Sequence, residues 1–153
     1  NWLTKTCGMD AAIDYKSESV VDRIAELCPQ GVDVFYDNVG GEILQAAVEN
    51  MAKFGRIVLC GQISSYDSDS SPEGPRNMMR MVYGSVTMRG FLARDYSEQF
   101  PTALADIRRW TEEGKIFHRE DLRSGFEQLP ETYLSLFTGG NAGTLLAKIA
   151  DED

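Results

Sequence analysis

The sequence predicts an α/β protein built on a parallel sheet, and three observations support that prediction. Two short runs, residues 32–37 and 56–60, are rich in the β-branched and aromatic residues typical of buried strands. Between them, residues 42–52 repeat apolar side chains at helical spacing. Glycines mark the junctions between these segments. A strand, a helix and a second strand joined by short turns imply parallel pairing with a right-handed crossover.

The residues before this unit predict further α/β elements. Residues 1–7 resemble the last turns of a helix that began earlier, because the Gly8 that follows is typical of a helix end. Residues 11–15 predict a short strand, and Ser17 is the expected N-cap of the helix that follows. A helix that starts at the first residue without a cap suggests that the sequence is a piece of a longer chain.

The second half continues the alternation. Residues 64–77 are rich in Ser, Asp, Pro and Gly and predict an exposed loop. The hydrophobic patterns that follow predict helices at residues 78–83, 96–113 and 129–137, and strands at residues 85–92, 121–124 and 144–149.

Composition excludes several classes of function. The 153 residues carry a net charge of −9, which disfavours nucleic acid and anionic membrane surfaces as partners. No apolar run has the length of a membrane span. Cys7, Cys28 and Cys60 are odd in number and far apart, which fits reduced thiols in the cytoplasm. With His118 as the only histidine, the sequence predicts no metal site.

Five segments, taken in order, resemble one known family. They are Asp14-Tyr15-Lys16, Asp37-Asn38-Val39-Gly40-Gly41-Glu42, Cys60-Gly61-Gln62-Ile63-Ser64-Ser65-Tyr66, Met88-Arg89-Gly90-Phe91-Leu92 and Gly139-Gly140-Asn141-Ala142-Gly143. Together they resemble the zinc-independent leukotriene B4 dehydrogenase / prostaglandin reductase branch of the medium-chain dehydrogenase/reductase superfamily, over essentially the whole chain. The resemblance implies NADP(H) as cofactor and reduction of the carbon–carbon double bond of a small enone or enal.

The resemblance also implies that parts of the fold are absent. The sequence contains no G-x-G-x-x-G turn, and the first two strands of the nucleotide-binding fold would precede residue 1. Residues 1–117 are therefore expected to form an incomplete Rossmann-type NADP-binding domain. Residues 118–153 are expected to be a C-terminal return segment that packs on the absent substrate-binding domain. The chain alone is expected to be inactive.

The missing strands have a predicted consequence for assembly. In the usual strand order, the first strand of the fold would lie beside residues 32–37, so its absence leaves that edge unpaired. An unpaired apolar edge is a template for another chain. The sequence therefore predicts a homodimer or a segment-swapped oligomer.

One residue is the predicted hydrogen-bond donor of the reaction. Hydride transfer to the β-carbon of an enone develops charge on the carbonyl oxygen, which a donor stabilises. By resemblance, Tyr66 orients the substrate or the cofactor as that donor. The alternative for Tyr66 is a loop tyrosine that packs on a neighbour. Tyr83 is a rival donor, with an apolar role on its helix as the alternative.

The predicted cofactor-binding residues begin with Tyr15 and Lys16. By resemblance, Tyr15 donates to the 2′-phosphate of NADP, although a strand-end packing role for Tyr15 and a solvated role for Lys16 are alternatives. Asn38, Gly40 and Gly41 follow a central strand, and ligands of open parallel sheets bind at the carboxyl ends of their strands. Their alternative role is a tight strand-to-helix turn.

The following segments add further cofactor-binding candidates. Gly61 follows the next strand in the same way, and Cys60 beside it is either part of that turn or a small buried apolar residue. Phe91, Leu92 and Ala93 resemble a family stretch whose backbone contacts the nicotinamide carboxamide.

Asn141 resembles a residue that contacts the cofactor from the return segment. Its alternative is a turn asparagine that tolerates positive φ. At the level of the whole chain two other functions stay open. One is a non-catalytic nucleotide-binding or oligomerisation module, and the other is a quinone reductase of the same superfamily.

Overall fold

The structure, a computed structural model, describes residues 2–65 and 74–150. Contacts along the chain gather into two compact units, and the division falls after residue 100. The predicted boundary between residues 117 and 118 concerns which domain each segment packs against in a whole protein, and it stays a prediction.

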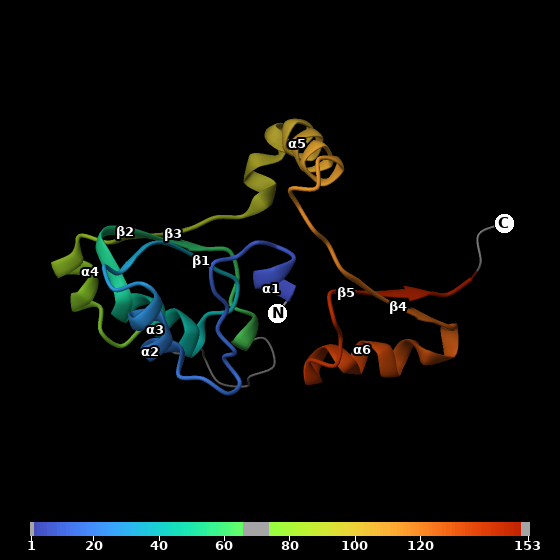
Figure 1. Cartoon of the computed structure of the whole chain (residues 1–153), viewed down its shortest axis with the longest axis horizontal. Helices are drawn as coiled ribbons and strands as arrows, with labels where there is room; N and C mark the ends of the chain where they lie inside the picture. Colours follow the sequence, from blue (N-terminus) through green and yellow to red (C-terminus); the bar gives the residue numbers. More distant parts are fainter. Residues whose placement is uncertain (1, 66–73, 151–153) are drawn as a thin grey trace. The chain divides into compact units, whose positions relative to one another are not determined.

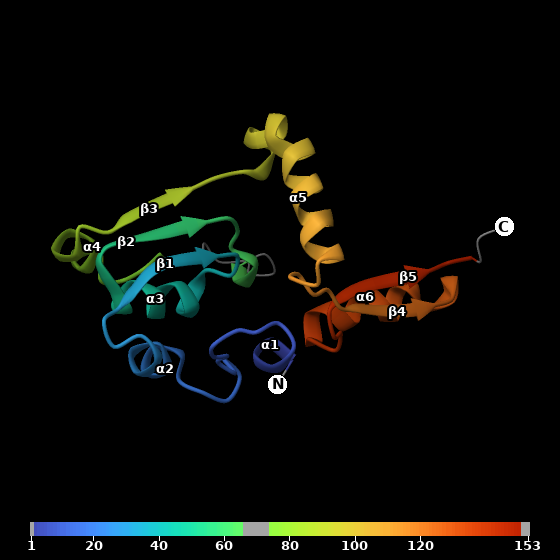
Figure 2. The same cartoon turned by 45° about the horizontal axis from the view of Figure 1, so that its top comes forward.

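The first unit contains a parallel sheet of three described strands, β1 (Val32–Asp37), β2 (Met51–Leu59) and β3 (Thr87–Gly90). Their order in space is β1-β2-β3, as Figure 2 shows. Asp37 lies opposite Leu59, and Leu59 lies opposite Gly90. The carboxyl ends of the three strands therefore lie side by side at one end of the sheet. The predicted α/β class with a Rossmann-type parallel sheet is confirmed.

Two helices of this unit, α2 (Val20–Leu27) and α3 (Gly41–Asn50), lie below the strands in Figure 2, with α3 against the sheet and α2 against α3. The short α4 (Met79–Gly84) precedes β3 and contacts β2, and α1 (Trp2–Lys5) stands at the start of the chain. Short 3-10 helices follow two of the strands, at Ile63–Ser65 and Ala93–Gln99.

The core of the unit lies between α3 and the sheet. Leu44 and Val48 of α3 are buried against Ile57 of β2, and Phe35 and Met88 pack around them. Burial of these apolar side chains fixes α3 beneath β1 and β2. The opposite face of the sheet is different, because Val34 is 53% exposed and Tyr36 is 55% exposed. None of the described helices of this unit covers that face.

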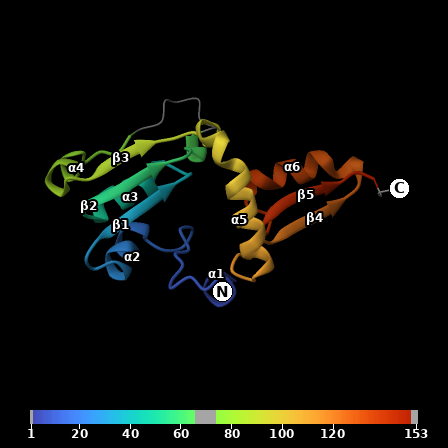
Figure 3. The same cartoon turned by 90° about the horizontal axis from the view of Figure 1, so that it is seen from above.

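The second unit is a small α/β arrangement. Strands β4 (Glu120–Ser124) and β5 (Thr144–Lys148) pair in parallel, with Glu120 opposite Thr144. A 3-10 turn (Phe126–Gln128) and α6 (Leu129–Thr138) connect them, as parallel pairing requires. Figure 3 shows the two strands side by side with α6 along them. The helix α5 (Phe100–Glu112) precedes β4 in the chain (Figure 1).

Three local predictions are wrong. Residues 11–15 form no strand, because none of the described strands lies beside them to supply hydrogen bonds. Ser19, not Ser17, is the N-cap of α2; the Ser17 hydroxyl donates instead to the Asp14 carboxylate at 2.7 Å. The helix expected to reach residue 52 ends at Asn50, because Met51 is already extended.

Residues 32–37 form β1, which is one of the two outer strands of the described sheet. The expectation that this edge is unpaired agrees with the described strand order. Within the described residues, no helix is long and apolar enough to span a membrane.

Candidate functional site

A cleft of about 660 Å³ opens where the three strands of the first unit end. We call it the strand-end cleft. Apolar side chains and the backbone of the turns after β1 and β2 form most of its wall. The lining residues are Asp37, Gly40, Leu44, Leu59, Cys60, Gly61, Gln62, Gly74, Pro75, Met88, Gly90, Phe91, Leu92 and Asp95.

A buried carboxylate holds the turn after β1. Asp37, the last residue of β1, is only 1% exposed. Its Oδ1 accepts hydrogen bonds from the backbone N–H of Val39 at 2.9 Å and of Gly40 at 3.0 Å, and its Oδ2 contacts the same Gly40 N–H at 3.1 Å. These donors lie at the N-terminus of α3, where a negative charge is stabilised by the free N–H groups and by the helix dipole.

Main-chain atoms join this turn to the turn after β2. The Asp37 carbonyl accepts from the N–H groups of Cys60 at 2.8 Å and Gly61 at 3.2 Å. The Asn38 carbonyl accepts from Ile63 N–H at 3.2 Å. The Val39 carbonyl accepts from Ser64, whose N–H lies at 3.1 Å and whose hydroxyl lies at 2.6 Å. The two turns therefore form one rigid wall of the cleft.

Gly40 is needed for this contact between the turns. Its φ is +73°, and a Cβ at this position would lie 2.5 Å from Cγ of Gln62. A side chain would therefore be strained by its backbone conformation and would push Gln62 out of the cleft wall. The tight-turn role left open for Gly40 has a physical basis here, and it does not conflict with a role in binding.

Aromatic rings line the same end of the sheet. The ring centroids of Tyr36 and Phe91 are 6.2 Å apart, and those of Phe91 and Tyr96 are 6.1 Å apart. A hydrogen bond with the Cys60 side chain raises the pKa of the Tyr36 phenol above its ordinary value. Tyr36 and Tyr96, whose rings lie beside Phe91, are not among the residues predicted from the sequence. The position of Tyr36, one residue before the end of a predicted strand, was the available signal.

The structure brings most of the first-unit candidates together. Five of the predicted cofactor-binding residues line the strand-end cleft, and three more adjoin them in the chain. The lining residues are Gly40, Cys60, Gly61, Phe91 and Leu92, and the adjoining ones are Asn38, Gly41 and Ala93.

Tyr15 and Lys16 lie elsewhere. Tyr15 is 62% exposed and lines a second hollow of about 370 Å³, beside residues of α2 and α3 and beside Arg76. The Lys16 N–H donates to the Asp14 carboxylate at 3.2 Å. The pKa of the Asp14 carboxyl is lowered chiefly by the hydrogen bond from the Ser17 hydroxyl and, to a smaller extent, by the one from the Lys16 N–H.

The two tyrosines predicted as candidate hydrogen-bond donors, Tyr66 and Tyr83, are located differently with respect to the described structure. Tyr66 lies outside the described residues. Tyr83 is 78% exposed on α4, and α4 leads into the amino end of β3, whereas the cleft lies at the carboxyl end. The strand direction therefore argues against Tyr83 as a donor in this cleft.

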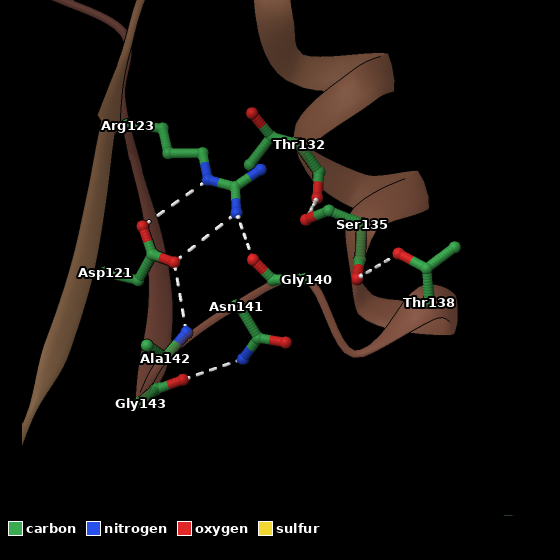
Figure 4. Close-up of polar contacts among 9 residues, drawn as sticks. All are labelled: Asp121, Arg123, Thr132, Ser135, Thr138, Gly140, Asn141, Ala142 and Gly143. Carbon is green, nitrogen blue, oxygen red and sulfur yellow. Dashed lines mark hydrogen bonds and ion pairs between the residues drawn. The ribbon is translucent and has the colours of Figure 1, made fainter.

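Asn141 belongs to the second unit, in the loop of residues 139–143, here called the return loop (Figure 4). Its Nδ2 donates to the Gly143 carbonyl at 2.8 Å. Asn141 is half-buried and does not have a positive φ, and its bond to Gly143 is a local contact within the turn, so the turn role left open for it stays open. The positive φ values of the loop belong to Gly139 and Gly143.

Within the described ranges, no three His, Cys, Asp or Glu side chains gather in a way that could hold a metal ion. None of the three cysteines forms a disulfide.

A family model described as "Zinc-binding dehydrogenase" matches residues 2–109, which is more than half of the chain. The chain belongs to this family. The matched range includes β1, β2 and β3 and every described residue that lines the strand-end cleft.

Named relatives within this family are consistent with the fold and the cleft. Prostaglandin reductase 1 of Sus scrofa is 37% identical over 146 residues, and NADPH-dependent curcumin reductase of Escherichia coli is 30% identical over 155 residues. These matches cover 94% and 98% of this chain but only 44% and 45% of the relatives. The chain therefore spans about half the length of the relatives it matches.

A solved structure matches the whole chain as well. CurA from Vibrio vulnificus, crystallised in complex with NADPH, superposes with a TM-score of 0.87 at 32% identity. That match covers 99% of this chain and 46% of CurA. The resemblance to the zinc-independent enone reductase branch is confirmed.

Proposed function

We propose that this chain supplies the nicotinamide-binding half of an NADPH-dependent oxidoreductase that reduces the carbon–carbon double bond of α,β-unsaturated ketones or aldehydes. The observation that carries the proposal is the strand-end cleft, whose rigid wall of two joined turns lies at the carboxyl ends of parallel strands. The names of the family relatives support both the cofactor and the substrate class.

The residues of the cleft fit a nicotinamide group. Leu44, Leu59 and Met88 supply an apolar wall for a flat ring, and the turns supply backbone polar groups at its rim. The backbone of Leu92 and Ala93 is the proposed partner of the nicotinamide carboxamide. The bound cofactor supplies the hydride.

The remaining roles belong to side chains that orient the ligands. Tyr66 is the proposed donor to the substrate carbonyl oxygen, on which negative charge accumulates as the double bond is reduced. Tyr15, with Lys16 beside it, is proposed to bind the 2′-phosphate at the second hollow. Asn141 is proposed to contact the cofactor from the return loop.

The chain is proposed to need the rest of a longer protein for catalysis, so the sharpest test is a binding map. We would titrate the isotope-labelled chain with NADPH to millimolar concentration and follow backbone amide shifts by NMR. The expected result is weak binding, with shifts centred on Asn38–Gly41, Cys60–Gln62 and Phe91–Ala93. In a parallel titration with NADH, which lacks the 2′-phosphate, the amide chemical shifts of Tyr15 and Lys16 should stay unchanged. A spectrum unchanged by NADPH would contradict the proposal.

A second proposal concerns assembly. We propose that two copies of this chain taken alone associate through β1, because it is one of the two outer described strands and its Val34 and Tyr36 are more than half exposed. An antiparallel pairing of β1 with its copy would satisfy a two-fold axis. Light scattering should give a mass that rises from monomer to dimer with concentration, and Val34→Lys should abolish the rise. A monomer at every concentration would contradict this assembly.

A further inference from the structure

Two charged side chains of β4 reach the return loop. Asp121 and Arg123 are two residues apart, so they point to the same side of the strand (Figure 4). Arg123 Nη2 contacts Asp121 Oδ2 at 3.3 Å, and Nε contacts Oδ1 at 3.4 Å. Both side chains are about three-quarters buried, at 23% exposure for Asp121 and 27% for Arg123.

The pair binds the loop on both sides of Asn141. Asp121 Oδ2 accepts a hydrogen bond from the Ala142 N–H at 3.1 Å. Arg123 Nη2 donates to the Gly140 carbonyl at 3.0 Å. The residue before Asn141 and the residue after it are therefore each attached to β4.

The loop needs such attachment because of its composition. Three of its five residues are glycines, which lose the most conformational entropy on ordering. Its ends are held by main-chain bonds, from Gly140 N–H to the Ser135 carbonyl at 3.0 Å and from Thr144 N–H to the Arg119 carbonyl at 2.8 Å. Between these ends, the Asp121–Arg123 pair fixes the peptide groups that flank Asn141.

The loop also fixes which atom Asn141 presents. Its Nδ2 is engaged with the Gly143 carbonyl at 2.8 Å, so the amide cannot turn over without losing that bond. In Figure 4 the Asn141 side-chain oxygen faces away from Asp121 and Arg123. Within the described part of the chain, that oxygen accepts no protein hydrogen bond. It is a hydrogen-bond acceptor directed outward.

We propose that Asp121 and Arg123 are positioning residues that hold the return loop so that Asn141 presents Oδ1 to a hydrogen-bond donor of the bound nucleotide. The donor is a hydroxyl or primary amide group. This inference rests on the proposed function. The pairing also matters electrostatically, because Arg123 neutralises a carboxylate that would otherwise repel a phosphate-bearing ligand.

The attachment itself is tested without any ligand. Hydrogen exchange of the Ala142 amide should speed up about tenfold in Asp121→Ala, as expected for loss of a hydrogen bond to a charged acceptor. Glu120→Ala, the neighbouring exposed residue of the same strand, is the matched control and should leave the rate unchanged. Equal rates in wild type and Asp121→Ala would overturn the attachment. Arg123→Met, which keeps the aliphatic stem, is the second variant should Asp121→Ala not fold.

The positioning role is tested by coupling to Asn141. NADPH titrations of the full chain would compare wild type, Asp121→Ala, Asn141→Ala and the double variant. Asp121→Ala should weaken NADPH binding about tenfold in the wild-type background and have almost no effect in the Asn141→Ala background. The same loss in both backgrounds would mean that Asp121 does not act through Asn141, and would overturn the role while the proposed function stands. No NADPH response in wild type would remove both, with the Ala142 exchange still reporting on the attachment.

Discussion

In the first unit the turns after β1 and β2 are joined mainly by main-chain hydrogen bonds around the buried Asp37, whereas the return loop of the second unit is held by the side chains of Asp121 and Arg123. The first arrangement depends on one carboxylate and on backbone geometry. The second depends on two partly exposed charges that solvent and salt can reach. The two regions should therefore respond very differently to mutation, pH and ionic strength.

The largest expected effect is that of Asp37→Ala. The substitution leaves the Val39 and Gly40 N–H groups without their acceptor in a buried turn, and we expect a loss of about 3 kcal/mol in the free energy of unfolding. Urea denaturation measures it. Asp33→Ala, on an exposed position of the same strand, should change stability by less than about 0.5 kcal/mol. Equal effects would show that the buried carboxylate does not hold the turn.

Gly40→Ala should have the next largest effect. Its positive φ and the contact with Gln62 together should destabilise the first unit by about 2 kcal/mol. The second substitution Gln62→Ala should restore the part of that loss which is steric. Gly74→Ala is the control, since a Cβ at Gly74 meets nothing within 4 Å. If the Gly40→Ala, Gln62→Ala double variant is as unstable as Gly40→Ala alone, the steric part of the prediction is wrong, and the whole loss of stability comes from the positive φ of residue 40.

Acid should release the return loop. Hydrogen bonds from Arg123 and from the Ala142 N–H hold the pKa of the Asp121 carboxyl below its usual value. The stabilisation is therefore present above the ordinary aspartate pKa and is lost as pH falls through the lowered one. The Ala142 amide shift, followed by NMR, should titrate at a lower pH than the carboxyl of a model aspartate. A transition at or above the model value would contradict the pairing.

Salt should have the smallest effect. Raising the ionic strength weakens a partly exposed ion pair, so exchange of the Ala142 amide should rise by about twofold. The Cys60 amide, which donates to a main-chain carbonyl, should exchange at an unchanged rate. An equal response of both amides would break the contrast between the two regions.

Periodicity predicted the elements that pack on each other. The apolar spacing of residues 42–52 predicted a helix with one buried face, and Leu44 and Val48 of α3 are buried in the structure. The strand expected at residues 11–15 failed because a strand is defined by its partners, and periodicity does not report whether a partner is present.

The site could be predicted only in part. Gly40 and Gly61 were identified because glycines after strands have a known geometric use, and they do line the strand-end cleft. The roles of Asp37 and Asp121 were not foreseen. The role of Asp37 follows from the burial of its carboxylate in the folded chain. The role of Asp121 follows from a contact with Ala142, 21 residues away, which a local sequence pattern does not encode.

The main-chain bonds between the turns after β1 and β2 have a consequence for redesign. Carbonyl and N–H groups are common to almost all residue types, so the frame of the strand-end cleft does not depend on the identity of most side chains that project from it. Leu92, half exposed at the rim, can be exchanged while Asp37 and Gly40 keep the frame in place. A library of variants substituted only at such rim positions would change the shape of the cleft while its members keep the same fold.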